Sequence, residues 1–263
     1  MTVLPLFRQC VEAIRAGALI ERESRQDKEF HFQNWFEKRL DATGLNYERS
    51  GRNKYPDFTM VHAADGYELK GLAYPGRDAN FDSNSQIPTG FHNGRNIYYV
   101  FGRYPKEPDG DSFPVIDLVF CHGDFLNADH TYQHKNKSVR AFGSYGDIMI
   151  RDRKMYVVPT PFHLADGVSH ARTLILPATV DAGSPLVEVG SLARIECPEL
   201  VVGYSFDLTN NDIGPRKIAN PDAGREHSFR AWRLQGDPGE NVTMRSSVGN
   251  QLVIELNDEE NGG

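Results

Sequence analysis

Apolar residues recur along this chain with two different periods. Residues 6–21 and about 28–43 carry them at helical spacing, and Gly44 provides a stop for the second helix. From residue 55 onward, short apolar runs bounded by turn residues replace the helical pattern and predict strands. The pattern therefore predicts an α/β protein in which two helices come first and strands dominate afterwards.

A hairpin is the clearest local feature of the strand region. Tyr55–His62 and Tyr67–Ala73 are predicted strands, and Asp65-Gly66 between them favours a tight turn. Residues 75–96 are rich in Gly, Asn, Ser, Asp and Pro and predict a long polar loop. Such loops inside compact domains are frequently functional.

Strands are predicted along the rest of the chain, without an internal repeat or a low-complexity linker. We expect one domain over 1–263, with a mixed central β-sheet flanked by helices at about 28–125 and a β-rich part at about 126–263. The further predicted strands lie at 96–104, 115–121, 148–150, 154–158, 173–176, 193–197, 200–206, 229–234 and 251–256.

Composition bounds the class of protein. Hydrophobic content is 39% and charged content 25%, and no apolar stretch approaches the roughly 18 residues of a membrane span. The N-terminus lacks the basic start and apolar run of a secretory signal. Cys10, Cys121 and Cys197 are scattered and odd in number, which indicates a reducing compartment, so we expect a cytoplasmic protein.

The segment from Tyr55 to Lys70 carries the candidate chemistry. Glu68 and Lys70 project from one side of a strand, and the hairpin brings Asp57 next to them. Two converging carboxylates suit a hard cation such as Mg²⁺, and a neighbouring lysine can orient an attacking water, as phosphodiester hydrolysis requires. The alternative is a solvated hairpin in which Glu68 and Lys70 form an exposed ion pair worth under about 1 kcal/mol.

Pro56-Asp57 and Glu68-Leu69-Lys70, on their strand–turn–strand, resemble the PD-(D/E)xK nuclease superfamily. Many members also place a glutamate on the preceding helix. Glu37 lies there, twenty residues before Asp57, and Glu29 is the less favoured candidate. The resemblance covers roughly residues 30–72 and implies a restriction-endonuclease-like core.

The resemblance also implies roles for these residues. Asp57 and Glu68 would bind one or two Mg²⁺ per active site, with the Leu69 carbonyl as a further ligand. Lys70 would position the attacking water, and Glu37 would support the metal shell or the lysine. The expected reaction is hydrolysis of a DNA phosphodiester bond.

Positive and amide side chains flank the predicted site. Because the net charge is −7, any DNA-binding surface would depend on local clusters of Lys and Arg. Arg and Lys contact phosphates, whereas Asn, Gln and Arg also suit base edges, although Asn is an ordinary loop residue as well. The candidate DNA-binding residues are Arg49, Arg52 and Lys54 before the first strand, and Arg77, Asn84, Gln86, Asn93 and Arg95 in the polar loop.

Among nucleases, a type II restriction endonuclease is favoured because the chain is long enough to read and cut by itself. By analogy with such enzymes we expect double-stranded DNA as substrate, a homodimer matching a palindromic site, and a cognate DNA methyltransferase as genetic partner. The alternatives are a PD-(D/E)xK repair or phage-type nuclease and a non-catalytic DNA-binding module. The sequence has no G-x-S-x-G motif, P-loop or dinucleotide fingerprint, which argues against those enzyme classes.

Histidines form a competing motif. His122 is followed by His130 and His134, and the last two are four residues apart, a spacing that zinc sites use on a helix. With a nearby asparagine the set also suits a His-Asn-His nuclease. The Asp, Asn, Gly and Thr residues of this stretch disfavour a helix, so surface histidines are the default interpretation.

Overall fold

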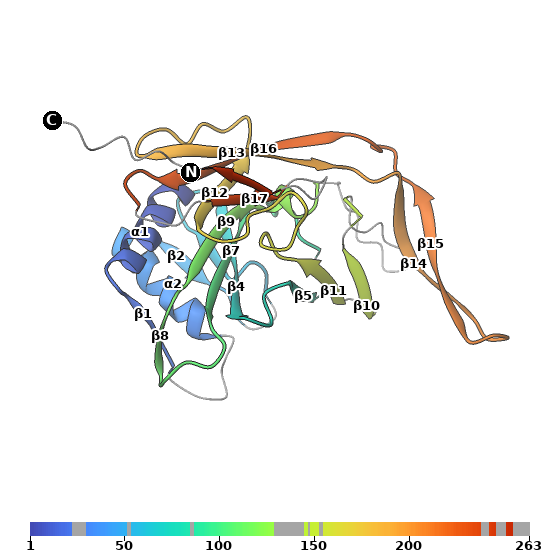
Figure 1. Cartoon of the computed structure of the whole chain (residues 1–263), viewed down its shortest axis with the longest axis horizontal. Helices are drawn as coiled ribbons and strands as arrows, with labels where there is room; N and C mark the ends of the chain where they lie inside the picture. The colour runs from blue at the N-terminus through green and yellow to red at the C-terminus, as the bar shows by residue number, and fades with distance from the viewer. Residues whose placement is uncertain are drawn as a thin grey trace.

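A computed structural model describes residues 1–22, 30–51, 54–84, 87–128, 145–146, 148–152, 155–237, 242–245 and 251–254 (Figure 1). These residues contain two α-helices, α1 (Val3–Arg15) and α2 (Phe30–Thr43), and a short 3-10 helix, η1 (Gly123–Phe125). The strands are β1 (Leu19–Glu21), β2 (Tyr47–Arg49), β3 (Phe58–Met60), β4 (Asp65–Tyr74), β5 (Asn80–Asn84), β6 (Phe91–His92), β7 (Arg95–Pro105), β8 (Ser112–Pro114), β9 (Asp117–His122), β10 (Met149–Asp152), β11 (Met155–Pro159), β12 (Arg172–Pro177), β13 (Leu186–Ile195), β14 (Glu199–Asp207), β15 (Asp212–Ala219), β16 (Glu226–Leu234), β17 (Val242–Arg245) and β18 (Gln251–Ile254).

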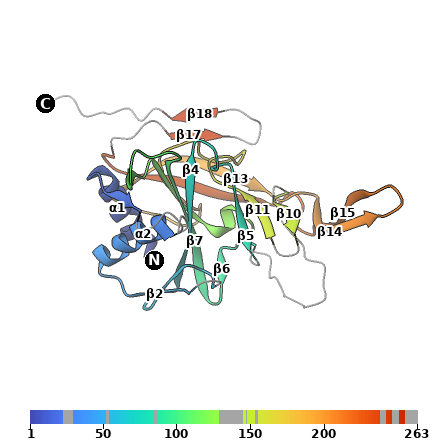
Figure 2. The same cartoon turned by 90° about the horizontal axis from the view of Figure 1, so that it is seen from below.

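A large mixed sheet organises the fold. Nine of the described strands form it in the order β13-β16-β12-β9-β7-β4-β3-β2, with β6 paired to β7. The neighbouring strands β4 and β7 lie at its centre (Figure 2). The pairs β4–β7 and β9–β12 are parallel and the others are antiparallel. Since β12, β13 and β16 belong to the same sheet as β2, β3, β4, β6, β7 and β9, the β-rich C-terminal part continues the N-terminal sheet. The α/β class and the large mixed sheet agree with the sequence.

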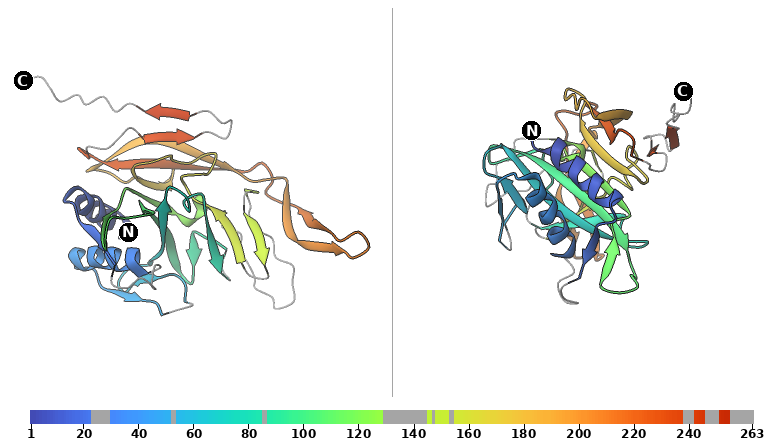
Figure 3. Two further views of the ribbon diagram at one scale, coloured as in Figure 1. Left: turned by 60° about the horizontal axis from the view of Figure 1, so that its bottom comes forward. Right: turned by 90° about the vertical axis from the view of Figure 1, so that its left-hand side faces the viewer.

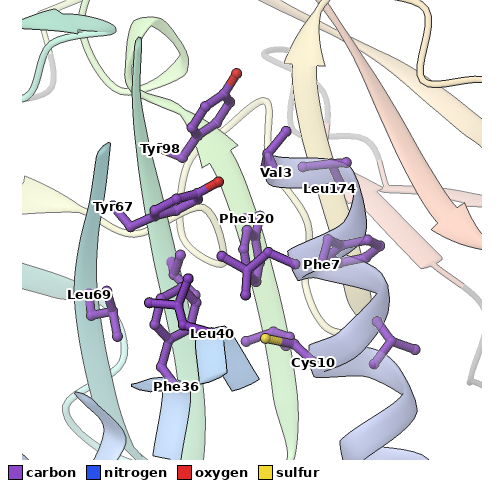
Figure 4. Packing of buried hydrophobic residues seen from close by; sticks show 14 of the residues in the cluster. Val3, Phe7, Cys10, Phe36, Leu40, Tyr67, Leu69, Tyr98, Phe120 and Leu174 are labelled. Carbon is purple, nitrogen blue, oxygen red and sulfur yellow. The ribbon is translucent and has the colours of Figure 1, made fainter. Parts of the chain in front are cut away.

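Both α-helices cover the same face of this sheet. Their apolar stripes pack on Tyr67 and Leu69 of β4, Phe120 of β9 and Leu174 of β12 (Figure 4). Phe7 of α1 meets Phe120 edge-on, with ring centroids 5.4 Å apart. Burial of these large apolar side chains supplies the driving force that fixes the helices on the sheet.

Two glycines allow α2 to pack closely against the sheet. A Cβ built on Gly102 of β7 would lie 2.2 Å from Cε2 of Phe32, and one on Gly71 of β4 would lie 2.9 Å from the Phe32 Cβ. The Phe32 ring therefore occupies space that any larger residue at these positions would take. This contact sets the position of α2 over β4 and β7, and with it the position of the next residue, Gln33.

The second face of the sheet is covered by strands and loops within the described residues. Phe81 of β5, Tyr156 of β11 and Phe162 lie in the core on this side. The polar loop predicted at 75–96 was wrong in part, because Asn80–Asn84 is a strand paired with Met155–Pro159. A partner more than seventy residues away decides that structure, which local composition cannot register.

The first helix also ends earlier than its pattern predicts. α1 stops at Arg15, Gly17 adopts φ +75°, and Leu19–Glu21 pairs with β8. Glycine takes this left-handed conformation without a steric penalty, so the chain turns there. The apolar residues from Ala18 to Ile20 keep helical spacing, which explains the prediction to residue 21. β15 and β17 are strands that the sequence pattern did not predict.

β14 and β15 form a hairpin that projects from the rest of the molecule (Figures 1 and 3). The ladder runs from Glu199–Ala219 to Asp207–Asp212, and neither strand pairs with another described strand. Leu208, in the turn, is 90% exposed. The hairpin is therefore a two-stranded sheet of its own.

Asp65 joins the predicted hairpin to the N-terminus. The hairpin β3–β4 is present, but its turn lies at 61–64, since Asp65 already belongs to β4. The buried Asp65 carboxylate accepts hydrogen bonds from the Thr2 backbone N–H at 2.6 Å and from Thr2 Oγ1 at 2.8 Å. It thus satisfies a donor at the start of α1 and complements the helix dipole.

Asp65→Ala is expected to lower the free energy of unfolding by about 3 kcal/mol, because two buried donors lose a charged acceptor. Urea denaturation followed by circular dichroism measures this change. Asp109→Ala, at an exposed position, serves as the control and should shift the unfolding midpoint little. A midpoint for Asp65→Ala equal to that of the wild type would contradict the capping role.

Neither described α-helix has the length and apolar run that a membrane crossing needs.

Candidate active site

Asp57 lies immediately before β3 and is tied to the next strand. Its Oδ2 accepts a 2.8 Å hydrogen bond from the Leu69 backbone N–H, and its Oδ1 accepts one of 3.1 Å from Gln33 Nε2. Phe58 pairs with Tyr67, so Asp57 continues the register opposite Glu68. The carboxylate replaces the main-chain partner that β4 loses where the β3 ladder ends, and this fixes its orientation.

Glu68 and Lys70 lie on the sheet face opposite to α2, since they alternate with Tyr67 and Leu69 of the helix-side core. Lys70 Nζ donates to Glu68 Oε1 at 2.7 Å, and the two side chains are 20% and 13% exposed. The ammonium also lies 5.4 Å from the centroid of the Phe81 ring. The pair is thus more enclosed than the solvated pair that was the alternative interpretation.

The Leu69 carbonyl lies on the same edge of β4 as Asp57. In a strand, the N–H and C=O of one residue point to the same side, and the Leu69 N–H points to Asp57. Two carboxylates and one main-chain oxygen are therefore contributed by Asp57, Glu68 and Leu69 from adjoining segments. Their role as Mg²⁺ ligands stays a prediction.

Two tyrosines beside the carboxylates were missed by the sequence reasoning. Tyr55 and Tyr99 share a 2.9 Å hydrogen bond between their hydroxyl groups. Burial raises the pKa of Tyr55 above its ordinary range, the Tyr99 hydrogen bond opposes this, and the charges of Glu68 and Asp57 add to it. Burial likewise raises the pKa of Tyr99. Both phenols therefore keep their protons and can donate hydrogen bonds but not act as bases.

The helix residue in contact with Asp57 is Gln33. Glu37, one turn later on α2, forms an ion pair with Arg49 and accepts a 3.3 Å hydrogen bond from the Tyr47 hydroxyl. Arg49 Nη2 in turn reaches Gln33 Oε1 at 3.5 Å. The structure therefore places Glu37 behind Gln33 and Arg49, where it pairs with Arg49 and Tyr47. An amide carries no charge signal, so the sequence analysis did not select Gln33; its helical spacing from Glu37 is the signal that could have found it.

For the DNA hydrolysis that the motif predicts, Gln33→Ala is expected to lower a single-turnover cleavage rate by about 10- to 100-fold, the effect typical of groups that orient an acidic ligand. Glu37→Ala is the matched variant and should cause a smaller decrease, because Glu37 acts through Arg49. A larger loss in Glu37→Ala than in Gln33→Ala would contradict this order.

The predicted DNA-binding residues fall into separate groups. Lys54, Arg77 and Asn93 are exposed. Arg95 holds the hairpin turn, because its Nη1 donates to the main-chain oxygens of Met60 at 2.7 Å and Ala63 at 2.9 Å. Arg49 forms an ion pair with Glu37 and a hydrogen bond with Gln33. Arg52 and Gln86 lie outside the described residues, as do Glu29 and the side chain of Asn84.

The donor chemistry of the site suits Mg²⁺. Among the described residues, no group of three or more His, Cys, Asp and Glu side chains converges on one point. Mg²⁺ is commonly held by only one or two carboxylates and retains several waters, so Asp57, Glu68 and the Leu69 carbonyl form an adequate donor set. A cation bound there would compete with Lys70 for Glu68.

Of the three histidines in the competing motif, the structure describes His122 alone. His122 Nδ1 accepts a 3.4 Å hydrogen bond from the Asp124 backbone N–H, and its ring packs edge-on against Tyr98. His130 and His134 lie outside the described residues. The zinc interpretation stays a prediction.

Comparison with protein-family models, with curated proteins and with solved structures finds no match to this chain. A function assigned to it therefore rests on the chemistry and placement of its own residues.

Proposed function

We propose that this chain is an Mg²⁺-dependent DNA endonuclease of the PD-(D/E)xK type, and more narrowly a type II restriction endonuclease. One observation carries the proposal: the Asp57 carboxylate is bound to the backbone of the strand that presents Glu68 and Lys70. The motif residues, thirteen positions apart in the sequence, are thus adjacent and fixed.

Each residue has a defined part in this proposal. Asp57 and Glu68, with the Leu69 carbonyl, would hold Mg²⁺, which would supply a Lewis acid for the charge that develops on the phosphate. Lys70 Nζ orients the water that attacks the phosphorus. Gln33 keeps Asp57 in place from α2. Tyr55 and Tyr99, whose ring centroids lie 6.4 Å apart, limit the access of bulk water to the carboxylates.

The narrower assignment rests on size and on analogy. The strands after residue 126 are not required to position the three site residues. A self-contained enzyme would use such elements to read DNA and to form a homodimer. The substrate is then double-stranded DNA, and a cognate DNA methyltransferase would protect the host chromosome.

The test is incubation of the purified protein with unmethylated phage DNA, in Mg²⁺ and in EDTA. Discrete fragments that appear only with Mg²⁺ are the expected result, and end sequencing gives the site. A smear would leave a nuclease but remove the restriction assignment in favour of a repair or phage-type enzyme. Intact DNA in both conditions would overturn the proposal.

The closed ion pair between Lys70 and Glu68 favours one second candidate, a DNA-binding module without catalysis. In that case the pair would be a structural contact. Retained DNA affinity together with intact DNA in Mg²⁺ is the outcome that would support it.

A further inference from the structure

A cavity opens on the sheet face that carries Glu68 and Lys70. It has a volume of about 690 Å³ and lies at the ends of β4 and β7, with Tyr74, Asp78, Arg103, His163, His170 and Arg245 in its lining. Tyr74 follows Lys70 by four residues on β4, on the same face. That spacing is about 13 Å, or about four nucleotides of stacked DNA strand.

Arg103 forms a rigid floor. Its guanidinium is bound by Asp117, by Asp78 at 3.3 Å and by the Ser169 carbonyl at 3.0 Å, and the residue is 5% exposed. The Tyr74 and Phe162 rings lie on it, each with its centroid 4.2 Å from the guanidinium carbon. Its charge is thus already compensated, and its role is to hold the walls of the cavity.

Tyr74 provides an accessible aromatic surface. One side of its ring rests on Arg103, while the residue remains 39% exposed. A planar ligand can therefore stack on an aromatic ring that the guanidinium keeps fixed. Base–aromatic stacking of this kind tolerates any base.

Donors for an anion come from separate segments at the rim. Arg245 of β17 uses its Nε for a 3.2 Å hydrogen bond to Ser169 Oγ, which anchors the side chain by one of its three nitrogens. His163 is 41% exposed and bonds Asp78 through Nε2 at 3.3 Å. His170 adjoins Ser169 and also lines the cavity. Guanidinium and imidazole groups are suited to binding phosphate oxygens.

We propose that this cavity binds one nucleotide of the DNA strand, with its base stacked on Tyr74 and its phosphate on Arg245 beside His170. The volume lies within the range of small-molecule sites. The DNA source of the nucleotide rests on the proposed function, since the cavity shares the face of Lys70. A base must leave the stack to enter, which costs least in single-stranded or distorted DNA.

The experiment uses single-stranded oligonucleotides that carry 2-aminopurine, in EDTA, so that binding is measured without cleavage. Quenching of the probe fluorescence is expected with the wild type and with Tyr74→Phe, which retains the ring. Tyr74→Leu should lose the quenching and weaken binding by about 5- to 150-fold, the range that base stacking supports. Arg245→Gln should weaken binding and reduce its salt dependence. Leu208→Ala, at the distant turn, serves as the control.

Affinities that stay unchanged in both Tyr74→Leu and Arg245→Gln would overturn the proposal. If Tyr74→Leu fails to fold, Arg245→Gln and Tyr74→Phe still decide it. A parallel titration with dAMP separates the two sources of nucleotide. Tyr74-dependent binding of dAMP without binding of the oligonucleotide would overturn the DNA source. Because the quenching experiment measures binding without cleavage, its result is independent of the phage DNA test. Nucleotide binding can be found when the phage DNA stays intact, and cleavage can be found when the cavity binds no nucleotide.

Discussion

Lys70→Ala is expected to slow Mg²⁺-dependent DNA cleavage by about 10²- to 10⁴-fold while DNA affinity stays near that of the wild type, as for the loss of a group that orients or deprotonates the nucleophile. Lys70 is the most informative single position. Its side chain contacts Glu68 and the Phe81 ring, so its removal leaves the backbone contacts of Asp57 intact. Single-turnover cleavage and a binding titration in Ca²⁺ measure the two effects separately.

Lys54→Ala is the matched control for this change. Lys54 is exposed and lies just before the hairpin, so its loss removes the same charge outside the site. We expect weaker binding with a smaller salt slope and an unchanged rate at saturating protein. An undiminished cleavage rate in Lys70→Ala would remove the lysine from the mechanism. Asp57→Ala should also abolish cleavage, but it additionally strips the Leu69 N–H of its acceptor.

Gly102→Ala is expected to lower the free energy of unfolding by about 3 kcal/mol, because the added methyl group overlaps the Phe32 ring on a tightly packed face. Displacement of Phe32 also moves Gln33, so cleavage should fall together with stability. Urea denaturation gives the first quantity and a single-turnover assay the second.

Two further variants make this prediction specific. Gly51→Ala adds the same methyl group where no atom of the described residues lies within 4 Å, and it should change stability by less than about 0.5 kcal/mol. Phe32→Leu in the Gly102→Ala background should recover part of the loss, since the smaller side chain frees the space. If the stability losses of the two single variants simply add in the double mutant, the proposed packing of Phe32 against Gly102 would be contradicted.

Local pattern is sufficient for the hairpin and for the three motif residues. Asp57, Glu68 and Lys70 are close in sequence, and strand alternation with one turn already brings them together. α2 has a stripe of large apolar residues that no strand period would explain, so its prediction at 28–43 lies close to the observed Phe30–Thr43. These are cases where short-range geometry decides the structure.

Tertiary contacts decide what the sequence left out. Gln33 becomes a site residue only because Phe32 fits over Gly71 and Gly102, and Tyr99 lies near Glu68 only because β4 and β7 run parallel. The Asp65-Gly66 step is a common turn pair, yet here the Asp65 carboxylate is buried and accepts a hydrogen bond from the Thr2 backbone N–H. Pairings over such distances leave no local periodicity for a sequence pattern to reveal.

The projecting β14–β15 hairpin gives the protein a natural attachment point for a spectroscopic label. Its ladder pairs only within itself among the described strands, so a dye at the turn would stand clear of the nine-stranded sheet. Cys10 and Cys121 are buried, and Cys197 is the one partly exposed thiol of the three. Thr209→Cys combined with Cys197→Ser would therefore direct a maleimide fluorophore to this tip, from which rotation of the molecule can be followed by fluorescence anisotropy.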